Sequence, residues 1–100
     1  MGENENPKYI AVLDFEATCD DGTEPDWISS KQEIIEFPVA LIDVEKRQIV
    51  DIFHSMVRPT LQPKLTAFCT GLTTIQQTDV DDQPTIEIVW SRFEDWLKKH

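Results

Sequence analysis

The strongest constraint on the fold is an apolar stripe near the end of the chain. Six apolar residues recur there at the spacing of one helix face: Ile86, Val89, Trp90, Phe93, Trp96 and Leu97. We predict a helix over residues 86–97, with Thr85 as its N-cap and the basic residues 98–100 where the helix dipole favours cations. A helix with two tryptophans on one face has to bury that face, so another layer must cover it.

Residues 8–16 form the first of three segments that could supply this layer. They alternate with the period of a β-strand. One face carries Ile10, Val12, Asp14 and Glu16, and the other carries Tyr9, Ala11, Leu13 and Phe15. Both faces are apolar as far as Asp14, which is typical of a central strand in a covered sheet, with Phe15 in the core.

Residues 33–44 and 48–57 are the other two strand-like runs, and the polar residues between them predict a hairpin turn. Pro38 lies inside the first run. A proline cannot donate to the sheet ladder, so it indicates a bulge or an edge strand there.

The remaining segments predict loops and short helices. Residues 17–31 contain glycine, proline and paired polar residues typical of a loop, and residues 58–63 read as a connector. We expect a short helix over residues 64–70 and a second one capped by Thr73, with Gln76 reaching back.

The domain organisation follows from this order of elements. The prediction is an α/β domain over residues 8–100, with three strands followed by helices, after a flexible lead-in of residues 1–7. Three strands make a thin sheet for a stripe of this size, so we expect a domain that is truncated at residue 100.

Composition excludes some classes of protein. The 40% hydrophobic content is too high for a disordered segment. The net charge of −10 argues against direct binding of phosphates, except where clustered carboxylates first bind divalent cations. We find no signal peptide or membrane span, and we expect an intracellular protein, cytoplasmic or nuclear. Cys19 and Cys69 lack metal-site spacing, and the sequence does not decide whether they form a disulfide.

Asp14 and Glu16 are the candidate metal ligands. In a continuous strand, residues two apart point to the same side with Cα atoms roughly 6.5–7 Å apart. A cation relieves the repulsion between two such carboxylates, and oxygen ligands select Mg²⁺ or Mn²⁺. The alternative is a strand end that simply meets water. A calcium-binding EF-hand loop is excluded because its sixth and twelfth positions would be Cys19 and Pro25.

Four segments in register carry a wider resemblance. They are VLDFEATCD, QEIIEFPVALID, FHSMVRPTLQPKLTAFCTGLT and VDDQPTIEIVWSRFEDWL. From residue 8 onward the chain resembles the first half of the DEDDh 3′→5′ exonucleases, in particular the animal histone-mRNA and small-RNA exonucleases and the cell-death-related nucleases. The resemblance implies a ribonuclease-H-like fold that opens with three antiparallel strands, and release of nucleoside 5′-monophosphates from a 3′ end with two Mg²⁺ or Mn²⁺ ions.

The resemblance also implies roles for single residues. Asp14 and Glu16 match the first two metal-binding acids. Glu16 would also contact the sugar hydroxyl of the 3′-terminal nucleotide, and Ala17 would contact that nucleotide through its own backbone. Leu72 would wedge against the terminal bases. Thr74 departs from the pattern, because the family usually has glycine there, and Gly71 stands where a larger residue is common; both bear on the shape of the base pocket.

The rest of the implied site is absent from these residues. In the family, the third and fourth acids and the general-base histidine follow in the second half of the domain. His54 lies within a predicted strand and His100 at the end of a predicted helix, so neither replaces that base. A non-catalytic nucleic-acid-binding or protein-interaction module is therefore the alternative. The resemblance favours RNA and leaves DNA open, and the sequence leaves both a monomer and a homo-oligomer open.

Overall fold

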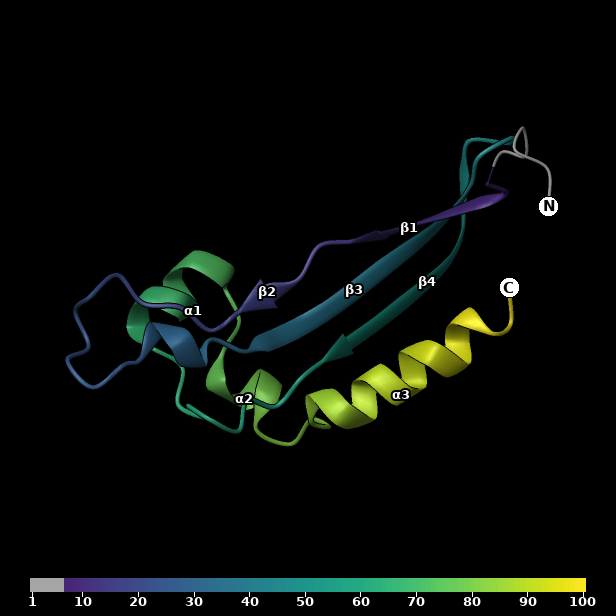
Figure 1. Ribbon diagram of the computed structural model, residues 1–100. Coiled ribbons are helices and arrows are strands. Elements are labelled where there is room, and N and C mark those ends of the chain that lie inside the picture. The colour runs from purple at the N-terminus through teal and green to yellow at the C-terminus, as the bar shows by residue number, and fades with distance from the viewer. Residues whose placement is uncertain (1–6) are drawn as a thin grey trace.

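The computed structural model describes residues 7–100, which form an antiparallel sheet with one long helix along a face and two short helices at one end (Figure 1). The strands are β1 (Tyr9–Leu13), β2 (Glu16–Ala17), β3 (Ile34–Asp43) and β4 (Gln48–Met56). Apart from Pro7, the predicted lead-in lies outside the described residues. The two strand-like runs at 33–44 and 48–57 form the predicted hairpin.

The central strand is β3, and not the first strand as predicted. Within the described residues, β1 and β2 pair only with β3, along one of its sides, and β4 pairs with the other side. Ile10 and Val12 on β1 are each 47% exposed. The apolar residues on both faces of β1 therefore suggested a central position that β1 does not occupy here.

Pro38 is accommodated without an edge position. It pairs with His54 on β4, inside the central strand. On the other side of β3, the pairing with β1 ends at Val39 and the pairing with β2 begins at Glu36. Pro38 thus faces the interval between β1 and β2, where the ladder makes no demand on its missing N–H.

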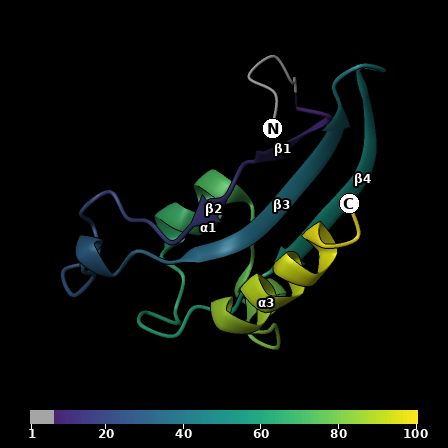
Figure 2. The same ribbon diagram turned by 45° about the vertical axis from the view of Figure 1, so that its right-hand side comes forward.

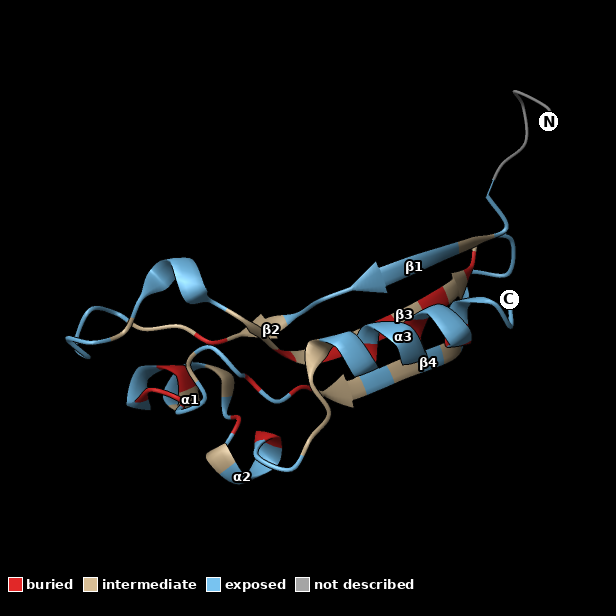
Figure 3. Ribbon diagram, turned by 60° about the horizontal axis from the view of Figure 1, so that its bottom comes forward, coloured by how far each residue is buried: buried red, intermediate tan, exposed pale blue. Residues whose placement is uncertain are grey.

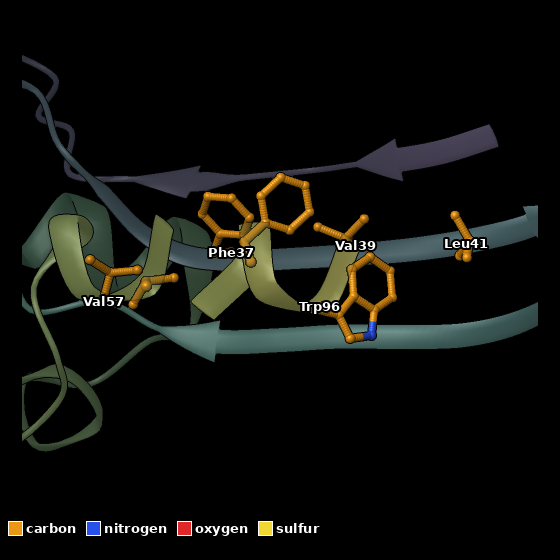
Figure 4. Packing of buried hydrophobic residues seen from close by; sticks show 7 residues of the cluster. Phe37, Val39, Leu41, Val57 and Trp96 are labelled. Carbon is orange, nitrogen blue, oxygen red and sulfur yellow. The ribbon is translucent and has the colours of Figure 1, made fainter. Parts of the chain in front are cut away.

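The long helix, α3 (Ile86–Leu97), covers one face of β3 and β4 (Figures 1 and 2). Alternate residues of β3 are buried against it, and Figure 3 shows the buried positions gathered along β3 and the inner side of α3. The cluster between them contains Phe37, Val39, Leu41, Val57, Val89, Phe93 and Trp96 (Figure 4). The predicted stripe is therefore core, although Trp90 and Leu97 at its border are 49% and 38% exposed.

A polar contact joins the end of α3 to β4. The carboxylate of Asp51 accepts hydrogen bonds from Trp96 Nε1 at 2.9 Å and from the backbone N–H of Ile52 at 2.8 Å, and His100 Nε2 lies 2.9 Å from the same carboxylate. The contact with His100, followed by the Ile52 N–H, holds the pKa of Asp51 below its usual range. The last turn of α3 is thus tied to the sheet by more than apolar packing.

The short helices are α1 (Ala67–Thr73) and α2 (Gln77–Val80). Thr66 caps α1, accepting a hydrogen bond from Cys69 N. The prediction that Thr73 caps the second helix is wrong, because Thr73 is the last residue of α1. Gln76 is the N-cap of α2, and its capping box is completed by Asp79. A second buried cluster holds these helices to the sheet: Ile35, Leu65, Cys69, Ile75 and Val80.

The loop predicted at 17–31 is largely confirmed, although it includes Ala17 of β2 and a short 3₁₀ turn, η1 (Ser29–Lys31). Glu33, which follows η1, anchors the connector at 58–63. Its carboxylate accepts backbone hydrogen bonds from Thr60, Leu61 and Gln62 at 2.7, 2.9 and 3.0 Å. No helix in the described part of the chain is long and apolar enough to cross a membrane.

Thr74 ends α1 in a left-handed conformation, with φ at 65°. A β-branched residue is strained there, and glycine is the usual residue at such a helix end. We expect Thr74→Gly to raise the free energy of unfolding by about 1 kcal/mol, measured by urea denaturation. Thr78→Gly, at an exposed helical position in α2, is the matched control and should lower it. A loss of stability in both variants would contradict this account of the strain.

Candidate functional site

The two candidate metal ligands lie in and directly after a break in the first strand. β1 ends at Leu13, one residue before Asp14, and β2 begins at Glu16. The prediction of one continuous strand through residue 16 is therefore wrong. Asp14 is exposed and Glu16 is half-buried, so one carboxylate lies in the break and the other on a short paired strand.

The pairing partners of the two strands explain the break. Leu13 pairs with Val39 and Glu16 with Glu36, so the same number of residues is passed over on each side. The register is kept across the break, and Asp14 falls opposite Pro38. Because proline has no N–H to donate, the ladder is interrupted next to the first candidate ligand.

Phe15, between the two acids, was predicted to lie in the core, and the structure places it there only in part. Its ring lies 4.7 Å from that of Phe37, centroid to centroid, and yet the residue is 40% exposed. The contact gives the break between β1 and β2 an apolar anchor on the central strand.

Glu36 is the residue at this site that the sequence did not single out. It is the cross-strand partner of Glu16, and paired residues of an antiparallel ladder project to the same face with Cβ atoms about 4.5–5.5 Å apart. Its Oε2 lies 2.6 Å from His54 Nε2. Like charges directly opposite each other are destabilising, and a bound cation would offset this repulsion. Glu36 stands in the letters EIIEFP, and only the strand register reveals that it faces Glu16.

The donor atoms of Asp14, Glu16 and Glu36 are all carboxylate oxygens, which suits Mg²⁺ or Mn²⁺. Among residues 7–100, however, no three acidic, histidine or cysteine side chains are grouped closely enough to hold a metal ion together. The described residues therefore fit the chemistry of such an ion and supply only part of a complete coordination shell.

The predicted substrate contacts, Ala17 and Leu72, lie on β2 and on α1. The backbone oxygen of Ala17 faces Cys69 Sγ of α1 at 3.7 Å. Leu72, also on α1, is 67% exposed, as a side chain that meets a ligand would be. The contact of Leu72 with the terminal bases stays a prediction, as do the roles of Asp14, Glu16 and Ala17.

A hollow of about 450 Å³ joins Glu36 to the region after Leu72. It lies between the ends of β3 and β4 and the two short helices, and its lining is mostly polar: Glu36, Met56, Thr73, Thr74, Ile75, Thr78, Asp79 and Gln83. Thr74, which departs from the family pattern, is thus one of the residues that line this hollow. The predicted positions of the two histidines are confirmed: His54 is on β4, and His100 follows α3.

Comparison with known proteins identifies the family. The family model for exonucleases of the RNase T type matches residues 11–100. The chain belongs to the DEDDh 3′→5′ exonuclease family. It is 42% identical over 90 residues to human 3′-5′ exoribonuclease 1, covering 90% of this chain and 25% of that protein.

Solved structures agree with this fold. The nuclease domain of 3′hExo, a DEDDh family member bound to rAMP, superposes with a TM-score of 0.81 at 42% identity, over 91% of this chain and 44% of that one. Cell-death related nuclease 4 gives 0.80 at 31% identity, over 92% and 30%. The predicted fold, an antiparallel sheet followed by helices of the ribonuclease-H-like exonuclease type, is confirmed, and the chain spans a quarter to less than half of these relatives.

Proposed function

We propose that the protein containing this chain is a metal-dependent 3′→5′ exonuclease that acts on RNA and releases nucleoside 5′-monophosphates. The observation that carries the proposal is the position of Asp14 in the β1–β2 break and of Glu16 at the start of β2, on a fold of the exonuclease family. A pair of divalent ions in such a site supplies an activated water and stabilises the leaving oxygen of phosphodiester cleavage.

In this reaction, the residues of this chain would hold the metal ions and orient the terminal nucleotide. Asp14 and Glu16 would bind Mg²⁺ or Mn²⁺ through carboxylate oxygens, with Glu16 held in place by pairing to the central strand. Glu16 and the Ala17 backbone would position the terminal sugar, and Leu72 would contact the terminal base. His54 and His100 each lie against a carboxylate, Glu36 and Asp51 respectively, and we assign the general base to neither.

RNA is the proposed substrate because the human relative is an exoribonuclease and the 3′hExo domain was solved with rAMP. DNA is kept as a second substrate because the chain is also similar to a cell-death related nuclease. We propose an intracellular protein, in the cytoplasm, the nucleus or both.

The test is a side-by-side digestion by the full-length protein. RNA and DNA of the same sequence, labelled at the 5′ end and carrying a 3′ overhang, are incubated with Mg²⁺ or Mn²⁺ and, as control, with a chelator. We expect stepwise shortening of the RNA from its 3′ end, and none with the chelator. Internal cuts, or shortening that survives chelation, would overturn the mechanism.

The alternative is a non-catalytic binding module, which the absence of a three-ligand group among residues 7–100 favours. The same digestion separates the two. Retention of labelled RNA by the protein without any shortening, in either metal, would favour the binding module over the nuclease.

A further inference from the structure

Two free cysteines lie beside the candidate site, and the proposed reaction uses neither. Cys69 is on α1 and fully buried, and Cys19 is half-buried in the segment that follows β2. Cys19 packs against the same buried cluster that contains Cys69. Residues fifty positions apart in the sequence are thus brought into one small region of the core.

Three polar contacts hold the two segments together around these thiols. The Thr66 hydroxyl donates to the backbone oxygen of Cys19 at 2.6 Å and accepts from the Cys69 N–H at 3.0 Å. Cys69 Sγ in turn faces the backbone oxygen of Ala17 at 3.7 Å. The Thr66 hydroxyl thus bonds to the backbone of both cysteines and fixes the Cys19 backbone beside the start of α1.

The ionisation of Cys19 reflects the same closeness. Burial raises the pKa of Cys19 to about 11, and the neighbouring Cys69 adds to this rise. Glu16 of β2 and Asp20 of the following loop contribute smaller electrostatic effects.

We propose that Cys19 and Cys69 form a reversible disulfide that links the segment after Glu16 to helix α1. Cys19 is the more accessible of the two and reacts first, while the buried Cys69 acts as the resolving thiol.

The chemistry balances with a small-molecule disulfide as oxidant. The Cys19 thiolate attacks one sulfur of the oxidant, forming a mixed disulfide and releasing one thiol. The Cys69 thiolate then attacks Cys19 Sγ and releases the second thiol. The protein loses two protons and two electrons, and the oxidant takes them up to become two thiols.

The cross-link has a consequence for the candidate site, and this part rests on the proposed function. A disulfide removes the S–H of Cys69 that faces the Ala17 oxygen. Ala17 is adjacent to Glu16, so oxidation changes the backbone beside a proposed metal ligand. We expect the oxidised protein to degrade RNA more slowly than the reduced protein.

The test begins with a readout that does not depend on nuclease activity. The protein is incubated with oxidised glutathione, and its intact mass and free thiols are followed. We expect loss of both thiols, a mass lower by two hydrogens, no covalent dimer, and full reversal by a reducing agent.

Two variants make the outcome decisive. Cys69→Ser should stop at a glutathione adduct on Cys19, and Cys19→Ser should leave Cys69 unreacted while the protein is folded. A stable glutathione adduct on the unsubstituted protein, or two unreacted thiols in the folded protein, would overturn the disulfide. A disulfide that forms without changing RNA degradation would overturn only its effect on the site, whereas inactivity of both redox forms would count against the proposed function.

Discussion

Glu16→Gln is expected to lower the exonuclease activity of the full-length protein by more than about a hundredfold, because even the outer partners of metal ligands are worth about 10–100-fold. Glutamine keeps the size of the side chain and removes the charge that would hold a divalent ion. Glu16 is half-buried on β2 and paired with Glu36, so the strand should keep its place while the ligand is lost. The measurement is the initial rate of RNA shortening with Mg²⁺.

Asp14→Asn should have a comparable effect, since Asp14 is the other proposed ligand. Glu94→Gln is the matched control, because Glu94 is exposed on α3, far along the chain from the site. It should leave the rate unchanged. Near-normal rates in both Glu16→Gln and Asp14→Asn would show that these carboxylates do not hold the catalytic metal.

Glu36→Gln probes the pair that the register revealed. Its loss removes a charge opposite Glu16 and the carboxylate partner of His54. An effect between those of the control and of Glu16→Gln would place Glu36 in support of the site, whereas a rate equal to the control would limit it to the fold.

Phe37→Ala carries the largest expected effect on stability, a loss of about 3–5 kcal/mol in the free energy of unfolding. Phe37 is fully buried on the central strand, and its ring packs against the rings of Phe15, Phe53, Trp90 and Phe93 at centroid distances of 4.7–6.2 Å. Removing it leaves a cavity between the sheet and α3 and withdraws the anchor of the β1–β2 break.

Phe68→Ala makes the same chemical change at a partly exposed position of α1, where Phe68 is 37% exposed. Urea denaturation of the two variants should give a clearly smaller loss for Phe68→Ala, because less apolar surface is returned to water. Equal losses would mean that the sheet–helix cluster around Phe37 does not dominate the stability of the chain.

Local chemistry alone determined most of the element order. The periodicity of residues 86–97 predicted α3 with its bounds, and the two strand-like runs predicted the ends of β3 and β4 to within one residue. These predictions succeeded because period and polarity are properties of neighbouring residues. The prediction that a helix begins at Thr73 failed, because a helix ends there instead and Thr74 takes a left-handed conformation. Threonine is an unusual residue in that conformation, so its identity gave no sign of a helix end.

The sequence by itself also named Asp14 and Glu16 as the pair to watch, through their spacing and their resemblance to a family. Only the tertiary structure showed that Pro38 of another strand interrupts the ladder beside Asp14, and that Glu36 faces Glu16. It alone brought Cys19 next to Cys69. Strand register and the packing of distant segments depend on which residues meet across the chain, and this is decided by the burial of the whole core rather than by any stretch of letters.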